Sequence, residues 1–157
     1  MSRVQLALRV ADLEASITFY RSLFGVEPAK RRPGYANFAI TEPPLKLVLI
    51  EGKADQPTVM DHLGVEVETT DEVHAATERL SSLGLFTAVE NDTTCCYALQ
   101  DKVWVHGPGA EPWEVYTVKA DATDATSIRP DAQPDASGCE CGTPTSTSGV
   151  PAATACC

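Results

Sequence analysis

The sequence has no hydrophobic run long enough to cross a membrane, and it is poor in basic residues. Its longest aliphatic run covers only residues 47–50, whereas a membrane helix needs about 20 apolar residues. Twelve Lys and Arg stand against 22 Asp and Glu, which gives a net charge of −10. A chain of this charge lacks the basic face that binds nucleic acid or anionic lipid. We therefore expect neither a nucleic acid nor a membrane as a partner.

The first ten residues, MSRVQLALRV, also lack the pattern of a secretory signal peptide. Arg9 interrupts the apolar stretch, and no small-residue cleavage site follows it. We therefore expect a cytoplasmic protein. Its six Cys are then expected to be thiols rather than disulfides, which leaves them available to metals or metalloids.

Large apolar residues are almost absent from the last quarter of the chain, where Ile128 is the one exception. Residues 120–157 contain no Leu, Met, Phe, Tyr or Trp, but ten Ser or Thr, eight Ala and four Pro. Such a segment buries too little apolar area to offset the loss of backbone entropy, so we predict a disordered tail there and one folded domain over residues 1–119. Four Cys of unassigned role lie in this tail: Cys139, Cys141, Cys156 and Cys157.

An internal repeat organises the predicted domain, because residues 4–25 resemble residues 61–84. Each copy begins with strictly alternating apolar and polar residues, which is typical of a strand with one apolar face, and continues with an apolar stripe at helical spacing. Short strand-like pieces follow both copies, at 35–40 and 45–50 in the first half and at 86–90, 95–100, 103–106 and 113–118 in the second. The unit is therefore βα followed by two or three strands, used twice. Arg9 and Glu66 occupy equivalent inward positions of the two copies, and we expect them to pair.

Four equivalent positions of the repeat carry polar side chains on the faces that the helices leave uncovered. Gln5 and His62 lie on the first strands of the two copies, and Lys46 and Glu114 on the last. An imidazole, a carboxylate and an amide oxygen can bind a divalent metal, whereas a protonated Lys has no lone pair. Three protein ligands that leave coordination positions open are typical of a catalytic metal site. The alternative is that His62 and Glu114 are ordinary half-exposed strand residues.

The chain resembles the vicinal oxygen chelate superfamily, which includes glyoxalase I, extradiol dioxygenases and fosfomycin resistance enzymes. The resemblance spans residues 2–118 and rests on the opening VQLALRVADLEASITFYRSLFGVEP, on His62 and on Glu114 within GAEPWEVY. It implies an α+β fold of two tandem βαβββ modules, 2–52 and 60–118, around one metal bound by Gln5, His62 and Glu114. Extradiol dioxygenases have His where Gln5 stands, and glyoxalases tolerate Gln there.

Two adjacent Cys, Cys95 and Cys96, lie in the stretch by which the second copy is longer than the first. Neighbouring residues of a regular strand point to opposite faces, so these thiols can share a ligand only where the backbone turns. A trivalent arsenical, R–As(OH)2, has two exchangeable oxygens and prefers thiolate, so a pair of Cys suits it, whereas arsenite favours three. The alternative is two incidental half-buried thiols.

This Cys pair and the Cys-containing tail make the chain similar to the organoarsenical carbon–arsenic lyases of the superfamily, whose pattern cadmium-induced proteins share. The resemblance implies a non-haem Fe(II) enzyme that uses O2 to cleave trivalent organoarsenicals, such as methylarsenite or aromatic arsenicals, to arsenite for detoxification. Cys95 and Cys96 would bind the arsenic, and Gln5, His62 and Glu114 the catalytic iron. The alternatives are another reaction on this scaffold, either thiol transfer or extradiol ring cleavage, and a non-catalytic protein that sequesters soft metals. The substituent on arsenic and the oligomeric state, a homodimer included, stay open.

Overall fold

The computed structural model describes residues 2–123 of the protein. The rest of the predicted tail, with Cys139, Cys141, Cys156 and Cys157, lies outside the described residues. The last strand continues to Asp121, two residues beyond the predicted end of the domain. Within the described residues, no helix is long and apolar enough to span a membrane.

Each half of the described chain has the order strand, helix and three strands. The first module comprises β1 (Arg3–Val10), α1 (Leu13–Phe24), β2 (Lys30–Arg32), β3 (Tyr35–Ile40) and β4 (Leu45–Glu51). The second comprises β5 (Val59–Glu66), α2 (Thr70–Ser82), β6 (Ala88–Cys95), β7 (Ala98–His106) and β8 (Pro112–Asp121). The predicted α+β class with two tandem βαβββ modules is thus confirmed.

Local signals start both helices where the two strands end. The Asp12 side chain accepts a hydrogen bond from the backbone N–H of Ala15 and so caps α1. Thr69 and Glu72 form a reciprocal capping box at the start of α2. Gly25 ends α1 in the left-handed conformation, with φ of 66°, which glycine adopts without steric cost.

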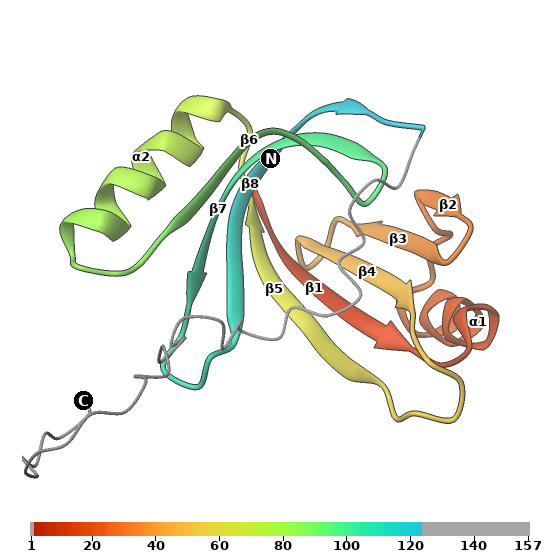
Figure 1. Ribbon diagram of the computed structural model, residues 1–157. Helices are drawn as coiled ribbons and strands as arrows, with labels where there is room; N and C mark the ends of the chain where they lie inside the picture. The colour runs from red at the N-terminus through yellow and green to blue at the C-terminus, as the bar shows by residue number, and fades with distance from the viewer. Residues whose placement is uncertain (1, 124–157) are drawn as a thin grey trace, which may run out of the picture.

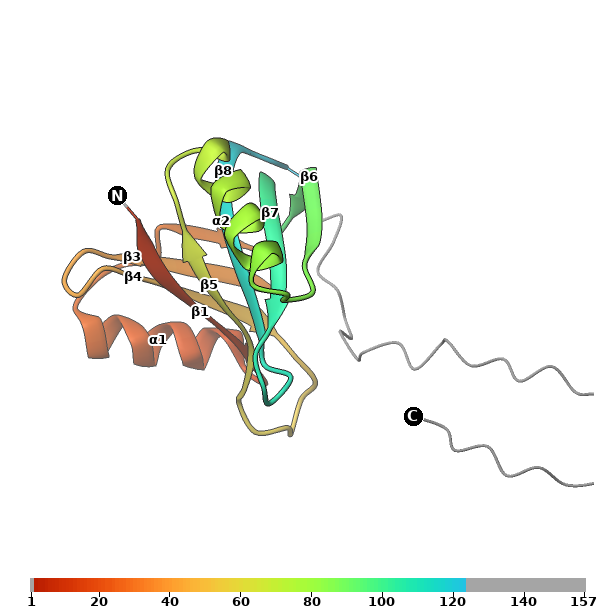
Figure 2. The same ribbon diagram turned by 90° about the vertical axis from the view of Figure 1, so that its left-hand side faces the viewer.

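The strands of both modules form one sheet in the order β2-β3-β4-β1-β5-β8-β7-β6. The first strands of the modules, β1 and β5, pair antiparallel at its centre, and each pairs in parallel with the last strand of its own module, β4 or β8. The sheet curls, and both helices lie outside the curl (Figures 1 and 2). Equivalent positions of the repeat therefore face one another across the concave side.

The helices cover the apolar face of the sheet, as the alternation predicted. Leu13 and Ile17 of α1 pack with Phe38, Leu47 and Leu49 in a buried cluster. Val73 and Ala76 are the buried residues of α2, which contacts β7 and β8. The concave face carries instead the polar residues Gln5, Lys46, His62 and Glu114, all of which are buried. Because these four polar side chains are buried, they must form hydrogen bonds or ion pairs with other protein groups.

The backbone between β6 and β7 differs from the predicted strand over 95–100. The chain turns at Cys96 and Tyr97, whose φ angles are 52° and 62°, and Cys95 pairs with Ala98 across the turn. A two-residue hairpin turn with two positive φ angles is normally made by Asn or Gly, neither of which is present. The turn supplies the break in alternation that two adjacent thiols need to share a ligand.

Candidate active site

Three neighbouring strands bring Gln5, His62 and Glu114 together. Gln5 of β1 and Glu114 of β8 both pair with Gly64 of β5, and His62 lies two residues before Gly64 on the same face of that strand. Gln5 Nε2 lies 2.9 Å from His62 Nε2 and 2.7 Å from Glu114 Oε1. His62 Nε2 lies 3.4 Å from the same carboxylate oxygen.

Gly64 makes this close approach sterically feasible. A Cβ at this position would lie 3.2 Å from three atoms, namely Cβ and Nε2 of Gln5 and Cγ of Glu114. Contacts this short would push both side chains outward. The glycine therefore leaves the space in which the amide and the carboxylate converge.

His62 is oriented by its neighbour in the chain. Its Nδ1 lies 2.6 Å from Asp61 Oδ1, which leaves Nε2 to face Gln5 and Glu114. Burial by itself lowers the pKa of His62, but the hydrogen bonds with Asp61 and Glu114 outweigh this and raise the pKa to about 9. A carboxylate on the far nitrogen is the usual support of a metal-binding His. Asp61 is also the ion-pair partner of Arg9, so the expected pairing of Arg9 with Glu66 is wrong.

Glu114 has a different partner on each of its oxygens. Oε1 faces Gln5 and His62, whereas Oε2 accepts a hydrogen bond of 2.8 Å from the buried ammonium of Lys102. Burial raises the pKa of Glu114, but Lys102 and His62 together lower it to about 2. The carboxylate is therefore charged, and one of its oxygens is directed toward Gln5 and His62. We call Gln5, His62 and Glu114 the polar cluster.

Tyr116 contacts the oxygen of the Gln5 amide, whose nitrogen donates to Glu114. Its hydroxyl lies 2.6 Å from Gln5 Oε1 and 2.8 Å from Glu66 Oε2, and it accepts from Lys46 Nζ at 3.0 Å. One hydroxyl has a single proton, and the ionised carboxylate is the stronger acceptor. Turning the amide by 180° would let Nε2 donate to Tyr116 and would bring Oε1 beside His62 and Glu114. It would also replace the hydrogen bond between Gln5 Nε2 and Glu114 Oε1 by two oxygens 2.7 Å apart, so this orientation requires a cation between them.

In that orientation three electron-pair donors converge: an amide oxygen, an imidazole nitrogen and a carboxylate oxygen. The set fits a divalent cation, which would replace the protons that now hold the atoms together. The described residues contain no cluster of three His, Cys, Asp or Glu side chains that could hold a metal, so a site here needs the Gln5 amide as its third ligand.

The two Cys of the β6–β7 turn lie against each other, with their sulfurs 3.4 Å apart. The hydrogen bond from Cys96 lowers the pKa of the Cys95 thiol below its usual range, burial acts in the opposite direction, and the charge of Lys102 adds to the lowering. The same hydrogen bond, with burial, raises the pKa of Cys96. The pair therefore shares a proton, and Cys95 is the sulfur that ionises first.

All five predicted site residues border one small cavity of about 30 Å³, namely Gln5, His62, Cys95, Cys96 and Glu114. The two thiols of the hairpin turn and the polar cluster therefore lie on the walls of the same small cavity. Sequence reasoning missed Lys102, which borders the same cavity. A signal for it existed, because Lys102 lies two residues before Trp104 and therefore on the same face of β7, and Trp104, which the sequence allowed either in the core or in a pocket wall, also borders the cavity.

A curled sheet of two βαβββ modules, with a buried polar cluster on its concave face, defines the class of protein. The chain belongs to the Glyoxalase/Bleomycin resistance protein/Dioxygenase superfamily, whose model matches residues 3–115. A trivalent organoarsenical cleaving enzyme of Thermomonospora curvata is 71% identical over 122 residues, which are 78% of this chain and 81% of the relative.

Two further relatives have the same name and a different one, respectively. A trivalent organoarsenical cleaving enzyme of Bacillus sp. strain MD1 is 37% identical over 152 residues, 94% of each chain. A cadmium-induced protein of Mycobacterium tuberculosis is 65% identical over 122 residues, 78% of this chain and 80% of the relative.

Solved structures share the fold at low sequence identity. The Mn(II)-bound glyoxalase from Novosphingobium aromaticivorans matches with a TM-score of 0.56 and 20% identity, over 82% of this chain and 44% of that one. A homoprotocatechuate 2,3-dioxygenase from Brevibacterium fuscum matches with a TM-score of 0.56 and 21% identity, over 76% of this chain and 37% of that one. At these identities the likeness concerns the fold alone.

Proposed function

We propose that the protein is a carbon–arsenic lyase that converts trivalent organoarsenicals to arsenite with Fe(II) and O2. The observation that carries the proposal is the placement of Cys95 and Cys96 in a turn, with sulfurs 3.4 Å apart, on the wall of the cavity that the polar cluster also borders. The names of two relatives, at 71% and 37% identity, support the same substrate class.

The thiol pair is the proposed site of substrate capture. R–As(OH)2 and two thiols give R–As(S–Cys)2 and two molecules of water, so each As–O bond is exchanged for an As–S bond. The low pKa of Cys95 provides the first thiolate, which is the nucleophile in such exchanges. Cys96 then closes the chelate, and its proton leaves with the second water.

Gln5, His62 and Glu114 are the proposed iron ligands. Iron bound there would supply the redox chemistry that O2 needs to react with the organic group, which Zn²⁺ cannot provide. Lys102 keeps the outer oxygen of Glu114 occupied, so the carboxylate offers the metal its inner oxygen only. Asp61 holds His62 with Nε2 facing inward.

A network of charged side chains holds Tyr116 and the Gln5 amide in place. Glu66 sits between Arg3 and Lys46, at 3.0 and 2.9 Å, and accepts from Tyr116 at 2.8 Å. These contacts fix Tyr116, which in turn fixes the amide of Gln5. Trp104 packs its ring edge-on against His62, with centroids 5.4 Å apart, and shields that side of the cluster.

The test combines oxygen uptake with product analysis on the full chain. For a methyl group the atoms balance when CH3As(OH)2 and O2 give As(OH)3 and formaldehyde. Protein loaded anaerobically with Fe(II) and then mixed with methylarsenite and O2 should release arsenite and formaldehyde in equal amounts, one of each per O2 consumed. Zn-loaded protein is the matched control and should release neither.

Three results would favour the other functions. Binding of one equivalent of arsenic or cadmium per Cys pair, without oxygen uptake or arsenite release, would support a sequestering protein. Oxygen uptake with a catechol but not with methylarsenite would support extradiol ring cleavage, and loss of thiol from an added electrophile would support thiol transfer.

A further inference from the structure

Tyr97 follows the two thiols at the tip of the β6–β7 hairpin, and it is only 7% exposed. Its φ of 62° lies in the left-handed region, which bulky aromatic residues rarely adopt. A residue keeps such a conformation only where the contacts around it over-determine it. The turn therefore indicates that the Tyr97 side chain makes contacts that Asn or Gly, the usual residues of such a turn, could not make.

The side chain of Tyr97 attaches the turn to the first module. Its hydroxyl donates to the backbone oxygen of Pro33 at 2.9 Å, and its ring packs on Tyr35, with centroids 5.6 Å apart. Pro33 follows β2 and Tyr35 begins β3, so both contacts cross from the second module to the first. The ring belongs to a buried cluster whose other members come from β1, β3 and β4: Ala7, Tyr35, Val48 and Ile50.

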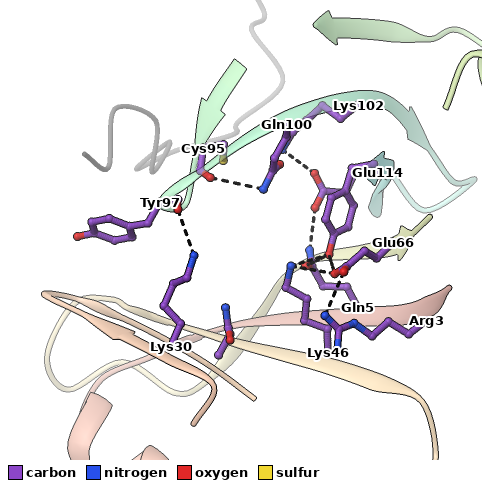
Figure 3. A network of polar contacts seen from close by, with 12 residues as sticks. Arg3, Gln5, Lys30, Lys46, Glu66, Cys95, Tyr97, Gln100, Lys102 and Glu114 are labelled. Atoms are coloured by element: carbon purple, nitrogen blue, oxygen red, sulfur yellow. Dashed lines mark hydrogen bonds and ion pairs between the residues drawn. The ribbon is translucent and has the colours of Figure 1, made fainter. Parts of the chain in front are cut away.

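The backbone oxygen of Tyr97 is held as well. It accepts from Lys30 Nζ at 3.2 Å and from the backbone N–H of Ala122 at 3.0 Å. Figure 3 shows Lys30 of β2 reaching to this oxygen from the first module. Lys30 also forms an ion pair with Asp121, the last residue of β8. Because β2 and β6 are the two edges of the sheet, these contacts close its curl at the turn of the thiols.

The attachment of Tyr97 fixes the place of the two thiols. Cys95 and Cys96 directly precede Tyr97, and Cys96 packs against the same buried cluster. The small cavity that both thiols border has one wall from the first module, made by Gln5, Tyr35, Lys46 and Val48. A hairpin attached only through its own strands would leave its tip free of that wall. The contacts of Tyr97 therefore hold the sulfurs at the cavity that the polar cluster borders.

We propose that Tyr97 is a positioning residue, which holds the β6–β7 turn on the first module so that arsenic bound to Cys95 and Cys96 lies at the polar cluster. Two adjacent thiols bind arsenic without Tyr97. What Tyr97 adds is the place at which the carbon–arsenic bond is presented to the proposed metal site. This inference rests on the proposed capture of arsenic by the two thiols.

Tyr97→Asn separates positioning from formation of the turn. Asn adopts a positive φ readily, so the turn and arsenic binding should be kept, while the contacts with Pro33 and Tyr35 are lost. If Tyr97 served the turn alone, Asn would be neutral or better. Tyr97→Phe keeps the ring and removes only the hydroxyl, so its effect should be intermediate. Tyr20→Phe removes a hydroxyl from α1 and is the matched control, which should change nothing.

The position of the bound arsenic can be measured through Trp104, which packs edge-on against His62 and borders the cavity of the thiols. The chain has two Trp, so Trp113→Phe makes Trp104 the single reporter and is the background for every variant. Methylarsenite added to the metal-free full chain should change the Trp104 emission, and Tyr97→Asn should lose most of this change. Arsenic content after gel filtration, less that of the Cys95→Ser, Cys96→Ser double variant, should be the same with and without Tyr97→Asn.

An undiminished emission change in Tyr97→Asn would overturn the proposal, and so would the absence of any change in the background protein. Lys30→Met removes a hydrogen bond to the Tyr97 oxygen without altering the turn residues, and it should lose part of the emission change. Arg31→Met removes the next cation of β2, which pairs with Glu14, and is its matched control. If Tyr97→Asn does not fold, a full emission change in both Tyr97→Phe and Lys30→Met would overturn the proposal.

Turnover separates this inference from the proposed function. Iron-loaded Tyr97→Asn should cleave saturating methylarsenite about 100-fold more slowly than the wild type, the cost of misplacing a reacting group by about 1 Å. Its iron content should be unchanged, because Tyr97 is not a proposed ligand. Cleavage by Tyr97→Asn at the wild-type rate would uphold the function and refute the positioning role. Loss of the emission change in Tyr97→Asn, without any cleavage by the iron-loaded wild type, would uphold the positioning role and refute the function.

Discussion

Lys102 donates from Nζ to Oε2 of Glu114 at 2.8 Å, and both side chains are almost completely buried. The ammonium also lies over the ring of Trp104, 5.2 Å from its centroid. A buried carboxylate keeps its charge only when a cation and hydrogen bonds compensate the loss of water. The pair therefore makes it feasible to hold an ionised Glu inside the protein, where its second oxygen faces Gln5 and His62.

Lys102→Met should destabilise the protein strongly, because it leaves the charge of Glu114 buried without its cation. Removing one partner of a buried ion pair costs roughly 3–5 kcal/mol, whereas exposed pairs contribute about 0–1 kcal/mol. Arg31→Met breaks an ion pair with Glu14 in which both side chains are more than half exposed, and it is the matched control. Urea unfolding should show a large loss for Lys102→Met and almost none for Arg31→Met. Similar losses for both variants would mean that the buried ion pair contributes no more to the free energy of unfolding than the exposed one.

The internal repeat predicted the fold and the inner polar face well. The alternation and the helical spacing depend only on residues within one strand or one helix, so they can be recognised without knowing how the elements pack. The repeat failed for Arg9 and Glu66, since equivalent positions of a repeat are related by rotation and need not touch. Glu66 pairs instead with Arg3, which lies directly opposite it on antiparallel β1 and β5, and with Lys46 of β4. The turn at Cys96 escaped the pattern as well, because its positive φ angles occur without Gly or Asn.

His62→Ala and Glu114→Gln should each abolish turnover while the protein still binds arsenicals. Each change removes a proposed metal ligand, but the thiols of Cys95 and Cys96 are untouched. Glu114→Gln keeps the shape of the side chain and a hydrogen-bond acceptor for Lys102, but it leaves the buried ammonium without its counter-charge, so circular dichroism must first show that the variant is folded. Iron content after anaerobic loading and arsenic content after gel filtration measure the two properties separately. Wild-type iron content in both variants would exclude the proposed metal site.

Gly64→Ala should weaken metal binding while the fold is kept. The added Cβ would lie 3.2 Å from atoms of both Gln5 and Glu114, so those side chains must separate by a few tenths of an ångström. Gly52→Ala is the matched control, because a Cβ there meets only ordinary contacts, the nearest at 3.5 Å. A metal titration should give a dissociation constant about tenfold higher or more for Gly64→Ala, as for the loss of supporting contacts at metal sites. An unchanged constant would place the metal away from this glycine.

Alkylation should distinguish the two thiols of the turn. The hydrogen bond from Cys96 lowers the pKa of Cys95, so a larger fraction of Cys95 is thiolate at pH 7 than for an ordinary thiol, whose pKa is about 8.5. Iodoacetamide reacts with the thiolate, so it should modify Cys95 first in metal-free and arsenic-free protein, and the rate should level off at a lower pH than for free cysteine. Peptide-resolved mass spectrometry over a pH series measures both rates. Cys96→Ala removes the hydrogen bond and should shift the profile of Cys95 to higher pH. Faster modification of Cys96, or a profile of Cys95 that this variant does not move, would show that the thiols do not share a proton as the geometry indicates.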